Sequence, residues 1–327
     1  MKKLLLSTTA ALILTGVAQA QDRGFAARDD AAQMTTNGFL DRRDDIAPDL
    51  FGLYWRDVHG PLAARIDGMH QYWQHHLGAP DADVLPVAVA ASGVDVAVSD
   101  ADRLEGLAEV TFASEADRGG MGASPAAGQL MEDEQNVFKG TYLHSSVKGN
   151  TRTLVDTGPG APQGERDAYH AILLIASNET ADAQAFRDLV TTQITPALAV
   201  SDDVVKVRYH LFEGYDASGW DTPNVDNDRT QEQAFDAWVE IAYPDRAATE
   251  AALAGIADAL ANPKLITAIH AYPVQAAYTL VYDGRPTLAG LRGASIAENI
   301  TQVGAANQAS LPVLQSMHGL DTEAPAN

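Results

Sequence analysis

The sequence predicts an α+β fold built from two ferredoxin-like βαββαβ repeats in one chain. A Pro- and Gly-rich segment, 156–166, is the best candidate for a linker between them. After it, apolar and alternating runs follow in the order strand, helix, strand, strand, helix, strand. The part before it gives the same order, although its first strand is weakly marked. Two such units predict two ferredoxin-like halves packed sheet against sheet.

The first repeat contains a helix whose pattern is interrupted. Five apolar or aromatic residues recur at three- and four-residue steps, the spacing of one helical face: Phe51, Tyr54, Val58, Leu62 and Ile66. Pro61 cannot donate a hydrogen bond to the preceding turn, and it biases Gly60 away from helix. We therefore expect His59 at a helix end or kink, where its side chain can leave the packed face.

A strand with two different faces follows this helix. One face carries Met69, Gln71, Trp73, His75 and Leu77. The other face carries His70, Tyr72, Gln74 and His76. This second face is polar and titratable, which suits the wall of a water-filled cavity.

The remaining elements follow from shorter runs. The first repeat continues with strands at 106–114 and 140–147, and a helix at 132–138 lies between them. The second repeat has strands at 170–177, 204–212, 235–243 and 265–278, with helices at 182–198 and 245–262. The resulting divisions are a signal peptide at 1–20, an N-terminal arm at 21–48, ferredoxin-like domains at 49–155 and 167–283, and a C-terminal helix or arm with a tail at 284–327.

Composition limits the cellular setting and the partners. A basic start, an apolar centre and Ala18-Gln19-Ala20 form a secretory signal in 1–20, with cleavage expected after Ala20 and a periplasmic or secreted product. The chain has no cysteine, which excludes disulfides, thiolate nucleophiles and Cys-ligated zinc. The formal charge of −22 argues against nucleic acid and anionic membranes as partners.

Two segments of the first repeat resemble the EthD-like family. The first segment reads YWRDVHGPLAAR at 54–65 and GMHQYWQHHL at 68–77. The second reads GLAEVTFASEAD at 106–117 and LMEDEQNVFKG at 130–140. The family's first strand is an apolar run, whereas 35–49 is charged here. The resemblance implies that the two halves form an intramolecular dimeric α/β-barrel. The second repeat has no counterpart of HGPLAAR, so its resemblance is architectural.

The candidate catalytic residues are His59, Tyr72 and His76. His59 titrates near neutrality and would act as general acid or base, while Tyr72 and His76 would orient the substrate. Alternatively, His59 could simply bind the last carbonyl groups of the helix, and the polar strand face could be exposed to solvent. The candidate substrate-binding residues are Trp55, Arg65 and His70; Arg65 could equally pair with a surface aspartate, and Trp55 could be part of the core. The sequence has no metal-ligand spacing and no organic cofactor motif.

Three functions remain open on these residues. The resemblance implies an enzyme of oxidoreductase type, a monooxygenase without an organic cofactor that acts on a small hydrophobic or aromatic compound in a barrel pocket. The same His and Tyr set would also serve a proton-transfer lyase or isomerase. A non-catalytic protein that binds a hydrophobic ligand is a further alternative, as is a scaffold whose barrel is filled by side chains. Self-association is left open.

Overall fold

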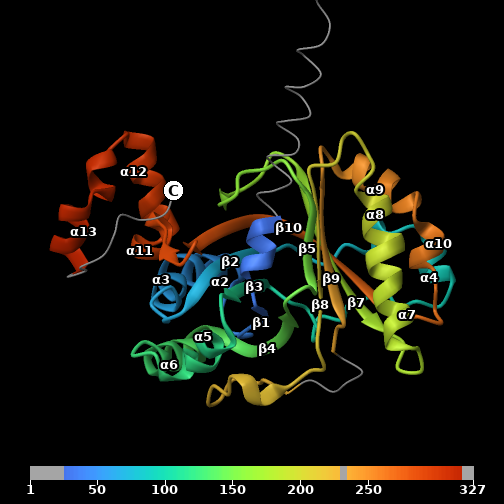
Figure 1. The fold of residues 1–327 in the computed structure, drawn as a ribbon, viewed down its shortest axis with the longest axis horizontal. Helices are drawn as coiled ribbons and strands as arrows, with labels where there is room; N and C mark the ends of the chain where they lie inside the picture. Colours follow the sequence, from blue (N-terminus) through green and yellow to red (C-terminus); the bar gives the residue numbers. More distant parts are fainter. Residues whose placement is uncertain (1–25, 229–233, 319–327) are drawn as a thin grey trace, which may run out of the picture.

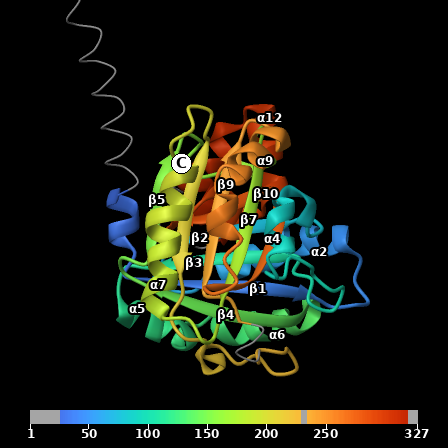
Figure 2. The same cartoon turned by 90° about the vertical axis from the view of Figure 1, so that its right-hand side faces the viewer.

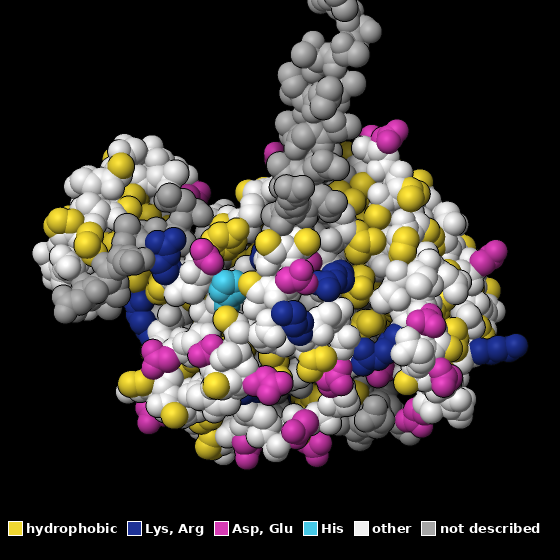
Figure 3. Space-filling model, viewed as in Figure 1, with side chains coloured by type: hydrophobic (Ala, Val, Ile, Leu, Met, Phe, Trp, Pro, Cys, Tyr) yellow, Lys and Arg dark blue, Asp and Glu magenta, His cyan; other side chains and the backbone are white. Residues whose placement is uncertain are grey.

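The computed structural model describes residues 26–228 and 234–318. The predicted signal peptide lies outside these residues. No helix within the described ranges is long and apolar enough to cross a membrane. On the face shown in Figure 3, acidic side chains are scattered, with basic side chains between them.

The first half of the chain forms a four-stranded sheet with the order β4-β1-β3-β2, the ferredoxin-like order. Its strands are β1 (Met34–Arg42), β2 (Met69–Leu77), β3 (Gly106–Phe112) and β4 (Phe138–Val147). A helix of three parts joins β1 to β2: α2 (Pro48–Tyr54), a π-helical turn (Trp55–His59) and α3 (Gly60–Ala63). Helices α5 (Glu115–Gly120) and α6 (Ala127–Val137) join β3 to β4.

The second half repeats this topology with the order β10-β7-β9-β8. Its strands are β7 (Tyr169–Ser177), β8 (Lys206–Leu211), β9 (Ala237–Tyr243) and β10 (Ile266–Tyr282). Its first helix consists of α7 (Ala183–Asp188), a π-helical turn (Leu189–Ile194) and α8 (Thr195–Leu198). Helices α9 (Arg246–Ala254) and α10 (Ala257–Leu260) follow β9, and α7 and α9 lie on the outer side of the sheet (Figure 2). The predicted order of elements is confirmed.

The two sheets join and close into a barrel. Strand β2 pairs with β10, which makes the strand order continuous across the halves. At the far end, β8 pairs with β5 (Thr151–Asp156), which follows β4 directly in the chain. Backbone hydrogen bonds from Glu213 to Ser145 and from Leu211 to Asn150, both 2.8 Å, join the end of β4 to the end of β8. One chain therefore supplies both halves of a dimeric α/β-barrel (Figure 1).

The prediction that residues 21–48 form a loose arm is wrong for Met34–Arg42. This segment is β1, and it pairs with both β3 and β4. Its polar side chains misled the prediction because one face of β1 points to a polar barrel interior. Asn37, on that face, is completely buried and accepts a hydrogen bond from the Trp238 indole at 3.2 Å.

The barrel interior, which we call the lumen, is filled by side chains from both halves. Arg208 of β8 reaches Glu109 of β3 at 2.6 Å, and His75 and His210 lie 3.4 and 3.6 Å from the same carboxylate. Lys206 pairs with Glu240 at 2.6 Å. These residues are at most 2% exposed. The lumen is thus lined by buried ion pairs.

The shorter elements cover the outside of this barrel. The predicted linker contains a short strand, β6 (Gln163–Gly164), which pairs with β10. Helix α4 (Val87–Ala91) lies between β2 and β3 in the chain. After the hairpin strand β11 (Arg285–Pro286) come α11 (Leu288–Arg292), α12 (Ala294–Val303) and α13 (Leu311–His318). These three helices extend to one side of the first half, next to α3 (Figure 1).

Candidate functional site

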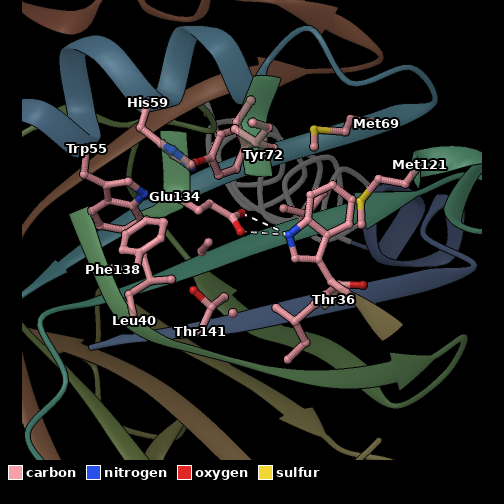
Figure 4. A pocket seen from close by; sticks show the side chains of 17 residues that line it. Thr36, Leu40, Trp55, His59, Met69, Tyr72, Met121, Glu134, Phe138 and Thr141 are labelled. Atoms are coloured by element: carbon pink, nitrogen blue, oxygen red, sulfur yellow. Dashed lines mark hydrogen bonds between the residues drawn. The ribbon is translucent and has the colours of Figure 1, made fainter. Parts of the chain in front are cut away.

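A cavity of about 80 Å³ lies between the first sheet and its helices, outside the lumen. Its floor is formed by β1, β3 and β4 through small or apolar residues such as Gly38, Ala108 and Leu143. The helices add Trp55, His59, Leu130 and Glu134. Figure 4 shows the side chains of Trp55, His59 and Glu134 at this cavity, whose remaining wall is largely apolar.

A π-helical turn places His59 at this cavity. The Gly60 backbone N–H bonds to the Trp55 carbonyl, five residues back, and Pro61 then has no N–H to continue the normal ladder. A Cβ atom at Gly60 would collide with Leu280 and lie 2.8 Å from the Gln74 amide nitrogen. The glycine therefore allows the helix to sit close to the sheet. The helix continues through His59 as a π-helical turn and does not end there.

His59 is hydrogen-bonded to a carboxylate. Its Nδ1 lies 3.0 Å from Asp133 Oδ2, and the Tyr54 hydroxyl donates to the other oxygen of Asp133. Burial alone would raise the pKa of Asp133, but the hydrogen bonds from His59 and Tyr54 outweigh it and lower that pKa. An ionised Asp133 accepts from Nδ1–H and leaves the lone pair on Nε2. A histidine held in this tautomer can accept a proton at Nε2.

Glu134 brings the second half of the chain to the same cavity. Trp220 donates its indole N–H to the two carboxylate oxygens at 3.0 and 3.1 Å, and the Thr222 hydroxyl donates to one of them. Burial raises the pKa of Glu134, although these donors and His59 oppose the shift. The segment between β8 and β9 thus covers a site that belongs to the first half.

Trp55, His59 and Tyr72, three of the residues selected from the sequence, line this cavity together. The hydroxyl of Tyr72 accepts a hydrogen bond from the Gln74 amide at 2.9 Å. Burial raises the pKa of Tyr72, with the hydrogen bonds from Gln74 and Trp55 acting against it. Tyr72 is therefore a neutral phenol at the cavity wall.

His76 lies in a different place. Its ring packs against Trp55 at 4.5 Å and Tyr278 at 5.1 Å, and it lines a second cavity of about 380 Å³ between α2 and β10. Burial and the positive charge of Arg56 lower its pKa to about 3. The structure therefore does not bring His76 to the cavity of His59 and Tyr72, because Trp55 stands between them.

Arg65 and His70 line neither of these two cavities. Arg65 donates to the Leu291 carbonyl at 3.4 Å and so contacts α11. His70 is half-buried, and its carbonyl accepts a hydrogen bond from Gly284. Among the described residues, no three His, Asp or Glu side chains are placed to hold a metal ion.

Four residues of the site were missed from the sequence: Asp133, Glu134, Trp220 and Thr222. A signal existed for the first two, since they lie in the LMEDEQNVFKG segment that carries the family resemblance. Trp220 and Thr222 reach the site only through the tertiary fold, and no local pattern marks them.

The fold and the site define the class of protein: a single-chain dimeric α/β-barrel with a carboxylate–histidine pair in one half. Residues 43–141, within the first half of the chain, match the model of the EthD domain. This match contains His59, Tyr72, Asp133 and Glu134.

Solved structures share the outline of the fold. A proposed monooxygenase from Lactobacillus acidophilus is 10% identical with a TM-score of 0.41, over 76% of this chain and 99% of that one. A proposed monooxygenase from Fusobacterium nucleatum is 8% identical with a TM-score of 0.44, over 76% and 94%. An anthrone oxidase-like protein is 13% identical with a TM-score of 0.45, over 76% and 94%. These values are too low to carry a conclusion about activity, and no curated protein matches the sequence.

Proposed function

We propose that the protein is an enzyme of oxidoreductase type that acts on a small apolar compound in the first-half cavity, with His59 as general base. The observation that carries this proposal is the 3.0 Å contact between His59 Nδ1 and an Asp133 whose pKa is lowered. A histidine oriented by a carboxylate at an apolar cavity is suited to proton abstraction. The signal-like segment at 1–20 supports a periplasmic or secreted setting.

The proposed reaction begins when His59 Nε2 removes a proton from an acidic C–H group of the substrate. The resulting carbanion then reacts with dioxygen. In a monooxygenation of a CH₂ group, one oxygen atom becomes the new carbonyl and the other leaves as water, so no organic cofactor is required. If the proton returns to another carbon instead, the same first step gives an isomerase. The polar groups at the cavity serve this first step in either case.

Proton exchange tests the shared step without knowledge of the natural substrate. We expect the protein to accelerate exchange of the α-protons of cyclopentanone for deuterium in D₂O, followed by NMR, and to lose this acceleration in His59→Ala. His59→Gln keeps a donor for Asp133 and controls for a folding defect. Exchange at the buffer rate with every small ketone tested, or full exchange by a folded His59→Ala protein, would refute the assignment.

A comparison of air with argon then separates the two reaction types. Oxygen consumption in air with formation of a carbonyl product supports the monooxygenase, whereas an isomerised product formed equally in air and under argon, with no oxygen consumed, supports the isomerase. Saturable binding with neither exchange nor product would identify a ligand-binding protein.

A further inference from the structure

Gln74 lies between Tyr72 and His76 in β2, and its completely buried amide is held in one orientation. Its nitrogen Nε2 lies 2.9 Å from the Trp55 carbonyl oxygen, which can only accept a hydrogen bond. At the other end of the amide, Oε1 lies 3.4 Å from His76 Nε2. Burial and the charge of Arg56 lower the pKa of His76 to about 3, so a neutral ring donates from Nε2. The Trp55 carbonyl and His76 therefore fix which end of the amide faces Tyr72.

The π-helical turn builds the contact that orients Gln74. The Trp55 carbonyl that accepts from the Gln74 amide also accepts from the Gly60 backbone N–H, which closes the turn. A Cβ atom at Gly60 would lie 2.8 Å from Gln74 Nε2 and 3.1 Å from the Trp55 oxygen. Any larger residue at this position would push the helix away from the amide. The glycine thus lets the backbone of one element hold a side chain of another.

The orientation of Gln74 decides what the Tyr72 hydroxyl can bind. Its oxygen accepts from Gln74 Nε2 at 2.9 Å and from the Trp55 indole. Neither an amide NH₂ group nor an indole N–H can accept a hydrogen bond in return. With its oxygen used by two donors, the hydroxyl can make a further bond only through its own proton. Tyr72 is 2% exposed and lines the first-half cavity together with His59 (Figure 4), so a molecule in this cavity can accept that bond.

We propose that Tyr72 donates a hydrogen bond to a carbonyl oxygen of the substrate, and that Gln74 is the positioning residue that keeps Tyr72 a donor. This inference rests on the proposed function of His59. When the C–H bond next to the carbonyl breaks, the proton goes to His59 Nε2. The electron pair forms a C=C bond and the C=O bond opens, so the negative charge lies on the oxygen, where Tyr72 stabilises it. His76, which lies outside the cavity, contributes through Gln74 alone.

The size of the cavity restricts the substrate to small molecules. In another protein an apolar cavity of about 150 Å³ binds benzene, whereas this one measures about 80 Å³. Met69 and Met121 line it, and unbranched methionine side chains readily change conformation. A compound with one small ring fits this space when these side chains move.

The test compares cyclopentanone with cyclopentane, a probe of similar size without an acceptor, in ligand-observed NMR titrations. We expect the wild type to bind cyclopentanone on the order of tenfold more tightly, as one good hydrogen bond would give. Tyr72→Phe should remove most of this preference without changing the affinity for cyclopentane. Gln74→Met keeps the hydroxyl but leaves its proton free to turn away, so the preference should fall several-fold. Gln71→Met is the matched control, because this buried residue lies on the opposite face of β2, with Trp73 and His75.

A double variant shows whether Gln74 acts through Tyr72. Gln74→Met should change the preference in the wild type but not in the Tyr72→Phe background, because the group that it positions is then absent. Tyr72→Phe should also slow the proton exchange of cyclopentanone by about 10²–10³-fold, the usual loss when one donor to a developing oxyanion is removed. If Gln74→Met weakened the binding of both probes equally, its role would be structural and the positioning role would be overturned.

The outcomes separate this inference from the proposed function. Equal binding of the two probes by the wild type, or a preference unchanged in Tyr72→Phe, would overturn the donor but leave His59 as a base. A preference that depends on Tyr72, with no proton exchange that depends on His59, would refute the catalytic role of His59 and keep the contact. Binding of neither probe would refute both.

An infrared measurement keeps the test decisive if a variant of Tyr72 or Gln74 does not fold. The carbonyl band of cyclopentanone bound to the wild type should lie at lower frequency than in cyclohexane, because a hydrogen bond weakens the C=O bond. Thr141→Val removes another hydroxyl from the cavity wall and should leave this band unchanged. A band at the cyclohexane frequency, or one that returns to it in Thr141→Val, would overturn the contact with Tyr72.

Discussion

The two halves of the chain use the same helix geometry for different ends. Each first helix contains a π-helical turn, Trp55–His59 in the first half and Leu189–Ile194 in the second. A proline follows two residues after the end of each turn, Pro61 or Pro196. Our expectation that the second half has no counterpart of the HGPLAAR segment is therefore incomplete, because the backbone counterpart exists and only the side chains differ.

Alignment on the prolines shows what changed. Two residues before the proline, the first half has His59 and the second has Ile194; six residues before it, they have Trp55 and Val190. Ile194 and Val190 are 0% exposed and belong to an aliphatic core under the second sheet. The space that is a cavity in one half is thus filled in the other. Polar and aromatic side chains therefore line a cavity in the first half, whereas aliphatic side chains occupy the matching helix positions in the second half.

The sharpest test of this comparison replaces the two matched residues. His59→Ala should reduce proton exchange by about 10²–10⁴-fold, the usual contribution of a general base. Ile194→Ala should leave the exchange rate of the folded protein unchanged but reduce the free energy of unfolding by about 2–5 kcal/mol, because it opens a cavity in the core. Exchange rates and urea denaturation of both variants provide the check, and equal loss of activity in both would break the comparison.

The lumen, which both halves share, should contribute to stability. Glu109→Gln leaves the buried Arg208 without its charged partner and should cost about 3–5 kcal/mol of unfolding free energy. The matched control is Arg246→Ala, which removes a surface pair with Asp81 and should cost at most about 1 kcal/mol. Urea denaturation measures both variants. A lumen variant as stable as the surface variant would show that the ion pairs do not hold the halves together.

Acid should weaken the lumen. Burial and the charge of Arg208 hold the pKa of His210 well below its ordinary value, although Glu109 acts against them. When the pH is below about 6.5, the ordinary pKa of histidine, His210 binds a proton in the unfolded chain but not in the folded one. Stability is thus fully present above that pH and falls below it by up to about 1.4 kcal/mol per pH unit. Denaturation measured between about pH 7.5 and pH 5 should show this slope. His210→Leu should reduce the slope, and the part that remains is expected from His76 and His170, whose pKa values burial also lowers.

The smallest expected effect concerns the contact between the second half and the site. Trp220→Phe removes the indole donor of Glu134 and should cost about 1 kcal/mol, the net value of a typical hydrogen bond. It should also weaken cyclopentanone binding, because Glu134 lines the same cavity. Trp238→Phe removes a similar indole bond to Asn37 in the lumen and is the control. Equal binding by the two variants would show that Trp220 has no role at the site.

Most of the fold could be predicted from the sequence because its strands have distinct faces. The alternation at 69–77 placed His75 and His76 on opposite sides, and the structure has them in the lumen and against Trp55. Strand β1 was missed because its polar residues face a polar lumen, where hydrophobic alternation gives no signal. The charged lumen forms only when the eight strands of the barrel come together, so the sequence of a single strand does not reveal it.

The site was predicted only in part, for a similar reason. His59 and Tyr72 come from one continuous stretch, where spacing relative to Pro61 and along β2 carries information. His76 shares the strand face of Tyr72, but the large Trp55 ring lies between them. The alternation of side chains along a strand cannot predict that a residue from a neighbouring helix separates two residues of one face. Trp220 lies far along the chain from Glu134, so only the assembled barrel brings them together.

The central claim is that ligand binds beside His59 in the first half and not in the lumen. The chain has four tryptophans, two at the cavity (Trp55 and Trp220) and two in the lumen (Trp73 and Trp238). Their indole N–H signals can be assigned in ¹⁵N-labelled protein with single Trp→Phe variants and followed during a cyclopentanone titration. We predict saturable shifts of the Trp55 and Trp220 signals with the lumen signals unchanged. Shifts confined to Trp73 and Trp238, or no shift at all, would contradict the account.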